Sequence, residues 1–154
     1  MSTQLSKYFT LEEMTRTGKA HLQQENLAES RPYTKAIADL CALILDPIRA
    51  RFGPVLVSSG FRGKRLTEAV NSKPTSQHCK GEAADFIVSG VKCATIVEWV
   101  ATESGLPFGQ VILEQPGDGR EWVHISLGEP YRKKNNRQVL HWNGKAYTPI
   151  TFPK

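Results

Sequence analysis

Hydrophobic residues recur at helical spacing in the middle of the first half of the chain. Between positions 34 and 51 they stand three or four residues apart, which is typical of a helix with one buried face. These residues are Ile37, Leu40, Cys41, Ile44, Leu45 and Ile48. Pro47 lies inside the pattern and has no backbone N–H, so we expect a kink or a restart there. Gly53 and Pro54 then end the helix.

Two further helices are predicted from local signals. Thr10 stands three residues before Glu13, which is the spacing of a capping box at a helix start, and Gly18 ends that helix. Residues 91–104 repeat apolar side chains with helical spacing. Residues 66–71 are expected to form a helical turn. Residues 19–32 are polar without a clear period, and we predict irregular structure for them.

Short apolar runs in the rest of the chain predict strands. They cover residues 55–58, 83–88, 110–113, 122–127, 139–142 and 146–150. The turn residues 116–119 predict a hairpin between the third and fourth strands, and Asn143-Gly144 predicts a tight type I′ hairpin turn. The pattern therefore indicates an α+β fold, in which helices pack on one face of a small, mainly antiparallel sheet.

Length and composition fit one soluble globular unit. The 154 residues are predicted to form a single domain, 1–154, with 40% hydrophobic and 23% charged residues. No apolar run approaches the roughly 20 residues of a membrane span. The first residues lack the apolar segment of a secretory signal, so we expect synthesis in the cytoplasm. We expect a monomer.

The three cysteines are too few for a disulfide framework. Cys41 and Cys93 lie in apolar helical patterns and are predicted to be core residues. Cys79 directly follows His78, and we do not expect two sequence neighbours to reach the same metal ion.

The positive charge is concentrated at the C-terminal end. The chain carries a net charge of +5, and no acidic residue follows Glu129. The basic residues there are Arg132, Lys133, Lys134, Arg137, Lys145 and Lys154. A basic end suits a polyanionic partner such as an anionic cell envelope, or it forms an ordinary solvated surface. No nucleic-acid-binding motif accompanies it, so we expect no nucleic-acid partner.

Two histidines and an aspartate predict a metal site. Ser76 to Asp85 reads SQHCKGEAAD, and Glu121 to His124 reads EWVH. A catalytic zinc takes three protein ligands and keeps a fourth position open for water, which suits His78, Asp85 and His124. The sequence has no four-cysteine or two-cysteine, two-histidine framework, which argues against a closed structural zinc site.

A zinc hydrolase also needs a general base, and two glutamates are candidates. Glu121 lies three residues before His124. On a regular strand these two positions face opposite sides, so Glu121 reaches the metal only if the strand begins or bulges between them. Glu114, at the end of the preceding strand, is the alternative base.

Arg62 and Ser76 complete the predicted site. Arg62 follows Gly60 and Phe61 at the end of a strand, where a guanidinium would neutralise an oxyanion or hold a substrate carboxylate. Ser76 stands two residues before His78 and would either contact substrate or cap the loop. An exposed loop arginine is the alternative for Arg62.

These segments resemble a known family. SGFR, SxHxxGxAxD and EWxH are similar to motifs of the zinc D-Ala-D-Ala peptidases, related to hedgehog-like and lysostaphin-like metallopeptidases. The opening LSKYFTLEEMT, the run LDPIR and the late NRQVL look more like the small bacteriophage branch. The resemblance implies a D,D-peptidase-like fold in which His78, Asp85 and His124 bind zinc.

The same resemblance implies the remaining roles. Glu121 would be the base, Arg62 would stabilise the transition state and Ser76 would contact substrate. Many phage relatives instead use a glutamate at the position of Glu114, which leaves the base open. The implied substrates are peptidoglycan stem peptides, cut at bonds involving D-amino acids by a carboxypeptidase or an endopeptidase.

The function expected is therefore that of a phage or prophage cell-wall lytic enzyme. It would act on the wall after release from the cytoplasm, or be carried in a virion. A non-catalytic zinc module that binds wall peptides or a protein is the alternative. A nucleic-acid-binding domain would rest on charge alone.

Overall fold

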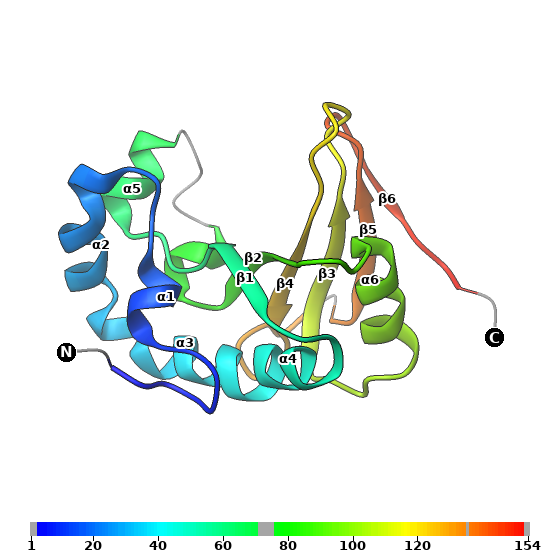
Figure 1. The fold of residues 1–154 in the computed structure, drawn as a ribbon, viewed down its shortest axis with the longest axis horizontal. Helices are drawn as coiled ribbons and strands as arrows, with labels where there is room; N and C mark the ends of the chain where they lie inside the picture. Colours follow the sequence, from blue (N-terminus) through cyan, green and yellow to red (C-terminus); the bar gives the residue numbers. More distant parts are fainter. Residues whose placement is uncertain (1–2, 71–75, 135, 153–154) are drawn as a thin grey trace.

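The computed structural model describes residues 3–70, 76–134 and 136–152, which form helices and a six-stranded sheet (Figure 1). The strands are β1 (Val55–Ser59), β2 (Ala83–Val88), β3 (Phe108–Glu114), β4 (Trp122–Leu127), β5 (Gln138–Trp142) and β6 (Tyr147–Pro149). Their order is β1-β2-β4-β3-β5-β6, and every neighbouring pair is antiparallel except β3 with β5. The predicted α+β class and mainly antiparallel sheet are confirmed.

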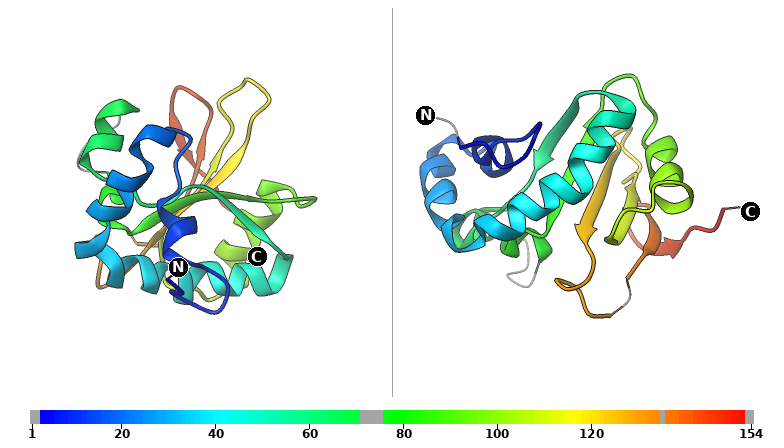
Figure 2. Two further views of the ribbon diagram at one scale, coloured as in Figure 1. Left: turned by 60° about the vertical axis from the view of Figure 1, so that its left-hand side comes forward. Right: turned by 90° about the horizontal axis from the view of Figure 1, so that it is seen from below.

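The helices form two groups around this sheet. They are α1 (Leu11–Thr15), α2 (Gln23–Glu29), α3 (Thr34–Leu40), α4 (Asp46–Phe52), α5 (Lys64–Ala69) and α6 (Cys93–Thr102). Short turns add η1 (Ala20–Leu22), η2 (Arg31–Tyr33), the π-helical η3 (Cys41–Leu45) and η4 (Gln77–Lys80). The α3–η3–α4 rod and α6 supply the helical half of the core, whereas α2 and α5 lie together at the other end of the molecule (Figures 1 and 2).

Strand alternation separates a core face from a polar face. On β4, Val123, Ile125 and Leu127 are buried in the main hydrophobic cluster beneath the helices. Each such side chain contributes roughly 1.5–3 kcal/mol by leaving water. Because successive side chains point to opposite faces, His124 between them lies on the other face of the sheet. The hydrophobic core thereby determines which face of the sheet carries the chemistry.

The long predicted helix is confirmed with its disturbance at Pro47. Its hydrogen bonds shift to the π pattern just before the proline, where the Asp46 N–H donates to the Cys41 carbonyl five residues back. Pro47 then stands in the first turn of α4, where its missing N–H is tolerated. The capping box at α1 is also confirmed, because Thr10 and Glu13 exchange both hydrogen bonds.

The irregular structure predicted for residues 19–32 is wrong. This stretch contains η1, α2 and the start of η2. The fully buried side chain of α2 is a polar one, Asn26, so the segment lacks the apolar period that identifies a helix. The turn predicted at 66–71 is α5, which begins at Lys64, and position 71 lies outside the described residues.

Both predicted hairpins form, but one turn differs. β3 pairs with β4, and β5 pairs with β6. The type I′ turn predicted at Asn143-Gly144 is wrong, because Trp142 pairs with Tyr147 and four residues connect them. Gly144 has a φ of +97°, and the Asn143 side chain accepts hydrogen bonds from the Lys145 and Ala146 N–H groups. The asparagine side chain, rather than a second positive φ, closes this loop.

The described residues bear on the expected absence of a membrane span and on the expected basic surface. Among the described residues, no helix is long and apolar enough to cross a membrane. Lys133, Lys134, Arg137 and Lys145 are exposed, whereas Arg132 is half-buried and Lys154 lies outside the described residues. The described basic residues near the C-terminal end are thus mostly solvated, and Arg132 is the partly buried one.

Candidate metal centre

Three elements bring the predicted ligands together. His78 lies in η4, Asp85 in β2 and His124 in β4. Asp85 and His124 are direct partners in the β2–β4 ladder, so both side chains lie on the same face of the sheet. The structure therefore assembles the triad His78, Asp85 and His124, whose candidate ligand atoms all lie within 4.8 Å of one another.

The triad has the geometry and chemistry of a divalent-metal site. The Asp85 Oδ1 atom lies 2.8 Å from His124 Nδ1 and 3.3 Å from His78 Nε2. His78 Nδ1 donates to the Gly60 carbonyl at 2.7 Å, which directs Nε2 toward the triad. Such a hydrogen bond fixes the tautomer of a metal-binding histidine. Two imidazoles and a carboxylate are a donor set that Zn²⁺ prefers, so the residues fit this ion.

The protonation states also suit metal binding. Burial lowers the pKa of His78 below its usual value, which keeps the imidazole neutral near pH 7. Burial opposes charge on Asp85, but the hydrogen bond from His124 and the proximity of His78 outweigh it and hold the pKa of that carboxyl well below its usual range. Neutral imidazole and ionised carboxylate are the forms that coordinate a cation.

Local backbone geometry explains the spacing of the SxHxxGxAxD segment. Ser76 caps η4, because its Oγ accepts from the His78 N–H at 3.2 Å. Gly81 ends η4 with a φ of +72°, and a Cβ there would lie 2.6 Å from Ile37. Glycine is therefore required both by conformation and by space. The chain can then enter β2 with Asp85 facing His78.

Arg62 lies beside the triad, on the β1 side. Its backbone N–H donates to the His78 carbonyl at 3.0 Å, which joins the SGFR loop to η4. Its half-buried side chain borders a hollow of about 350 Å³ together with Ser58 and Ser59. Its positive charge contributes to lowering the pKa of His78. Among the described residues its Nε has no hydrogen-bond partner. Arg62 thus lies next to the candidate ligand His78, and its role at the site stays a prediction.

Asn26 is a structural residue that sequence reasoning missed. Its Nδ2 donates to the Thr15 and Phe61 carbonyls at 2.7 and 3.0 Å, and its Oδ1 accepts from the Gly63 N–H at 2.7 Å. It thus holds both neighbours of Arg62 from a buried position. Nothing in the surrounding polar sequence distinguishes it from its neighbours.

Replacing Asn26 with alanine should lower the free energy of unfolding by about 3 kcal/mol. The change leaves the Phe61 carbonyl and the Gly63 N–H without their partner, whereas the Thr15 carbonyl keeps Gln23 Nε2. Each buried group left without a partner costs roughly 1–3 kcal/mol before relaxation. Urea unfolding followed by circular dichroism measures the loss. Gln24→Ala, an exposed change in the same helix, is the control, and equal stability of the two variants would contradict the prediction.

Glu114 shares the triad face of the sheet. It pairs with Trp122 on β4, two positions from His124, and its carboxylate accepts a hydrogen bond from the Trp122 indole N–H. Burial, and next the charge of Asp85, raise the pKa of Glu114 above its usual value. A partly buried carboxylate held beside a metal triad has the placement of a general base.

Glu121 is not brought to the triad. Glu121 directly precedes β4 and, two residues before Val123, lies on the same side of the strand as Val123. Its exposed side chain therefore turns toward the start of α6. There its carboxylate accepts from the Cys93 N–H at 3.2 Å and from Gln115 Nε2 at 2.9 Å. These hydrogen bonds lower its pKa. The bulge that would turn Glu121 toward His124 is absent from the described start of β4, where Trp122, Val123 and His124 pair in regular register with β3.

A groove of about 370 Å³ runs over the triad face. It contains the alternative base Glu114 and the candidate ligand His124, and Ser76 lies at its wall. Ser76 therefore caps the start of η4 and also lies at the groove, so the two alternatives for this residue are compatible. The groove is lined by Ser76, Gln77, Gln110, Ile112, Glu114, His124, Arg132, Leu140 and Tyr147.

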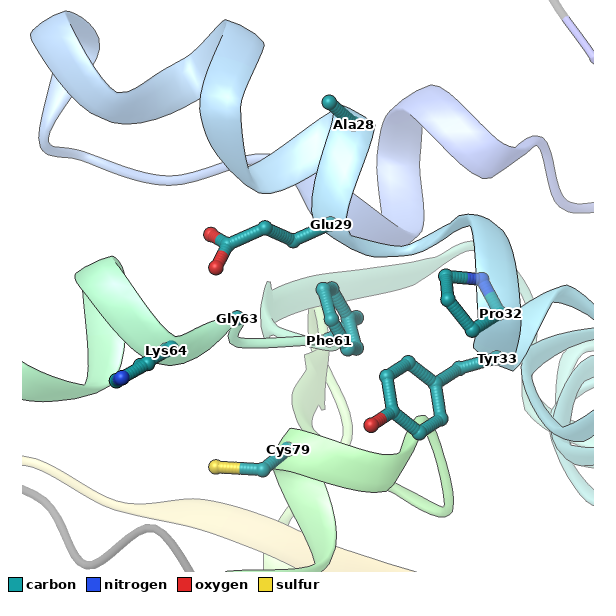
Figure 3. A pocket seen from close by; sticks show the side chains of 8 residues that line it. All are labelled: Ala28, Glu29, Pro32, Tyr33, Phe61, Gly63, Lys64 and Cys79. Atoms are coloured by element: carbon teal, nitrogen blue, oxygen red, sulfur yellow. The ribbon is translucent and has the colours of Figure 1, made fainter.

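A second cavity, of about 500 Å³, lies between α2 and the loops that carry Arg62 and His78 (Figure 3). Tyr33 and Phe61 form its aromatic wall, with ring centroids 5.5 Å apart. The residues around it are Ala28, Glu29, Pro32, Tyr33, Phe61, Gly63, Lys64 and Cys79. It includes no member of the triad, so the larger cavity is not the metal site. Cys79, which contacts Thr67, belongs to this cavity.

The three cysteines should differ sharply in reactivity. Cys41 and Cys93 are buried, as predicted, and burial raises the pKa of both thiols, that of Cys93 to about 12. Thiolate is the reactive form, so neither should react in the folded protein. At pH 8, iodoacetamide should label only Cys79, and all three should be labelled after denaturation. Peptide mapping by mass spectrometry measures this, and modification of Cys41 or Cys93 in folded protein would contradict it.

Comparison with known proteins agrees with this geometry. A family model for Peptidase M15 matches residues 7–126, which is more than half of the chain and includes all three triad residues. The chain belongs to the Peptidase M15 family. This family consists of zinc-dependent D-Ala-D-Ala peptidases, so the predicted family is confirmed and the chain has a metallopeptidase framework with a peptide as the implied substrate. A search of curated proteins finds no match.

Proposed function

We propose that this M15 member is a zinc peptidase that hydrolyses peptidoglycan stem peptides or cross-links at bonds involving D-amino acids. The observation that carries the proposal is the His78–Asp85–His124 triad on an open groove, with the carboxylate of Glu114 on the same face. The family supports peptidase chemistry, and the SGFR, SxHxxGxAxD and EWxH motifs resemble those of wall peptidases.

Each side chain has a role in this proposal. Zn²⁺ held by the triad would supply Lewis acidity and make water acidic near neutral pH. Glu114 takes the proton of the attacking water and returns it to the leaving amine, which is the work of a general acid–base group. Arg62 offers positive charge to the developing oxyanion, and Ser76 contacts the peptide at the groove wall.

We further propose the biological setting of a phage or prophage lytic enzyme. The protein would reach the wall after release from the cytoplasm, or as part of a virion. The exposed Lys133, Lys134, Arg137 and Lys145 would favour contact with an anionic envelope. The similarity of the LSKYFTLEEMT, LDPIR and NRQVL segments to the small bacteriophage branch supports this setting.

Digestion of purified sacculi tests the function. Zinc-loaded protein is incubated with sacculi beside a His78→Ala control, and the released fragments are identified by mass spectrometry. Loss of a terminal D-alanine would identify a carboxypeptidase, and separated cross-links an endopeptidase. Equal traces from both proteins, with zinc bound to the wild type, would contradict the proposal and favour a module that binds wall peptides without cutting them.

A further inference from the structure

The groove has a cationic end opposite its acidic end. Across the sheet, one row of paired residues contains Asp85, His124, Ile112 and Leu140. Glu114 lies two positions along β3 on one side of this row. On the other side, at a similar distance, Gln110 pairs with Gln138, and Arg132 lines the groove there.

Arg132 is held in place before any ligand arrives. Its Nε donates to the Lys134 carbonyl at 3.0 Å, and its Nη2 donates to Gln138 Oε1 at 3.1 Å. The same Gln138 oxygen accepts from Gln110 Nε2 at 2.9 Å. Gly109 leaves space for the arginine stem, since a Cβ there would lie 2.8 Å from Arg132 Cδ. A side chain fixed in this way loses little further conformational entropy on binding.

The charge of Arg132 lacks an acidic partner within the described part of the chain. None of the ion pairs found there includes it. A guanidinium carries five N–H donors, and the two hydrogen bonds above leave donors for a ligand. Its planar fork matches the two oxygens of a carboxylate, which is the usual anionic group of a peptide. A preorganised, unpaired guanidinium at a groove end therefore has the chemistry of a carboxylate subsite.

We propose that Arg132 binds a carboxylate of the substrate, within about two residues of the bond that is cut. The inference rests on the proposed function, because the scissile bond is placed at the triad. Two positions along a strand span about 7 Å, and an extended peptide advances about 3.3–3.6 Å per residue. The carboxylate is either the chain terminus or a side-chain group at that distance.

This subsite comes from the C-terminal part of the chain. The family match ends at residue 126, whereas Arg132, Gln138 and the β5–β6 hairpin follow it. At this end of the groove, Gln110 and Gly109 lie within the matched part. The triad thus provides chemistry common to the family, and the segment after β4 provides selection among peptides.

Binding to a zinc-loaded Glu114→Gln protein tests the subsite without turnover. Isothermal titration calorimetry compares three N-acetylated peptides. The first is Lys-D-Ala-D-Ala as the free acid, and the second is its C-terminal amide. The third is a C-terminal amide whose last residue carries a side-chain carboxylate instead of the alanine side chain. We expect one carboxylate-bearing peptide to bind roughly 10- to 100-fold more tightly than the plain amide. Which of the two binds tightly identifies the carboxylate source.

Substitutions then assign the preference to Arg132. Arg132→Gln should remove it, Arg132→Lys should retain a part, and Lys133→Gln, which removes the neighbouring exposed charge, should leave it unchanged. Equal binding of all three peptides, no measurable binding of either acid, or an equal loss for acid and amide in Arg132→Gln would overturn the inference. Hydrolysis by the unsubstituted protein is scored separately. Arg132-dependent binding without hydrolysis would refute the peptidase function and leave the subsite in place.

Discussion

Replacing Glu114 with glutamine should lower kcat/KM for stem-peptide hydrolysis by about 10²- to 10⁴-fold, which is the usual contribution of a general acid–base group. Zinc affinity should change little, because Glu114 is not one of the three clustered ligand residues. Glutamine can still accept the Trp122 hydrogen bond, so the fold around the site should survive. D-Alanine release measured by mass spectrometry and zinc content measured on the same samples check both parts.

Glu121→Gln is the matched control for this experiment. We expect its kcat/KM to stay within about threefold of the wild type, because its carboxylate faces the start of α6 rather than the triad. Glu121→Ala should instead lower the free energy of unfolding by about 1 kcal/mol, as expected for loss of a negative group at a helix N-terminus. A loss of activity in Glu121→Gln as large as that in Glu114→Gln would return the role of base to Glu121.

The two glutamates show what sequence spacing can and cannot decide. Strand alternation indicated that positions 121 and 124 face opposite sides, and the structure shows this arrangement. The family motif pointed to Glu121 nevertheless, and only a bulge would have reconciled the two. The actual partner of Glu121, the N–H of Cys93, lies 28 residues away and depends on where α6 begins. No local pattern encodes such a contact.

The clustering of the three candidate ligands could be predicted because local rules constrain each of them. Gly81, the alternation along β2 and the buried apolar residues on either side of His124 are all readable in the sequence. The β5 strand is different. Its own residues gave no sign that it would pair in parallel with β3, and this pairing positions Gln138 and Arg132 at the groove. The placement of these two residues depends on topology and therefore lay beyond the sequence pattern.

Helix α2 marks a second limit. Its residues bury little apolar surface, and its role depends on the hydrogen bonds of Asn26 to three backbone groups in distant loops. A method that reads hydrophobic periods detects helices that pack against a core. It does not detect a helix that is retained because one polar side chain holds a loop beside the site.

Zinc should raise the thermal stability of the protein by a large, concentration-dependent amount. A ligand that binds only the folded state at 1,000 times its Kd adds about 4.1 kcal/mol. For a chain of this size that corresponds to an increase in Tm of roughly 8–16 °C. Metal-free protein should remain folded, because the hydrogen bond from His124 to Asp85 already links β4 to β2, and the hydrogen bond from His78 to the Gly60 carbonyl holds η4. Differential scanning calorimetry across a zinc titration, with chelated protein as the starting point, measures the increase.

His124→Ala should abolish this increase, and His141→Ala should retain it. His141 is the fitting control because it is another half-buried histidine of the sheet, and its Nε2 is engaged with Gln115 rather than with the triad. A zinc-dependent increase that survives in His124→Ala, or that is lost equally in His141→Ala, would place the metal elsewhere. A result of the first kind would also remove the basis for a catalytic ion on this groove, since the peptidase proposal requires the metal and Glu114 to share one face of the sheet.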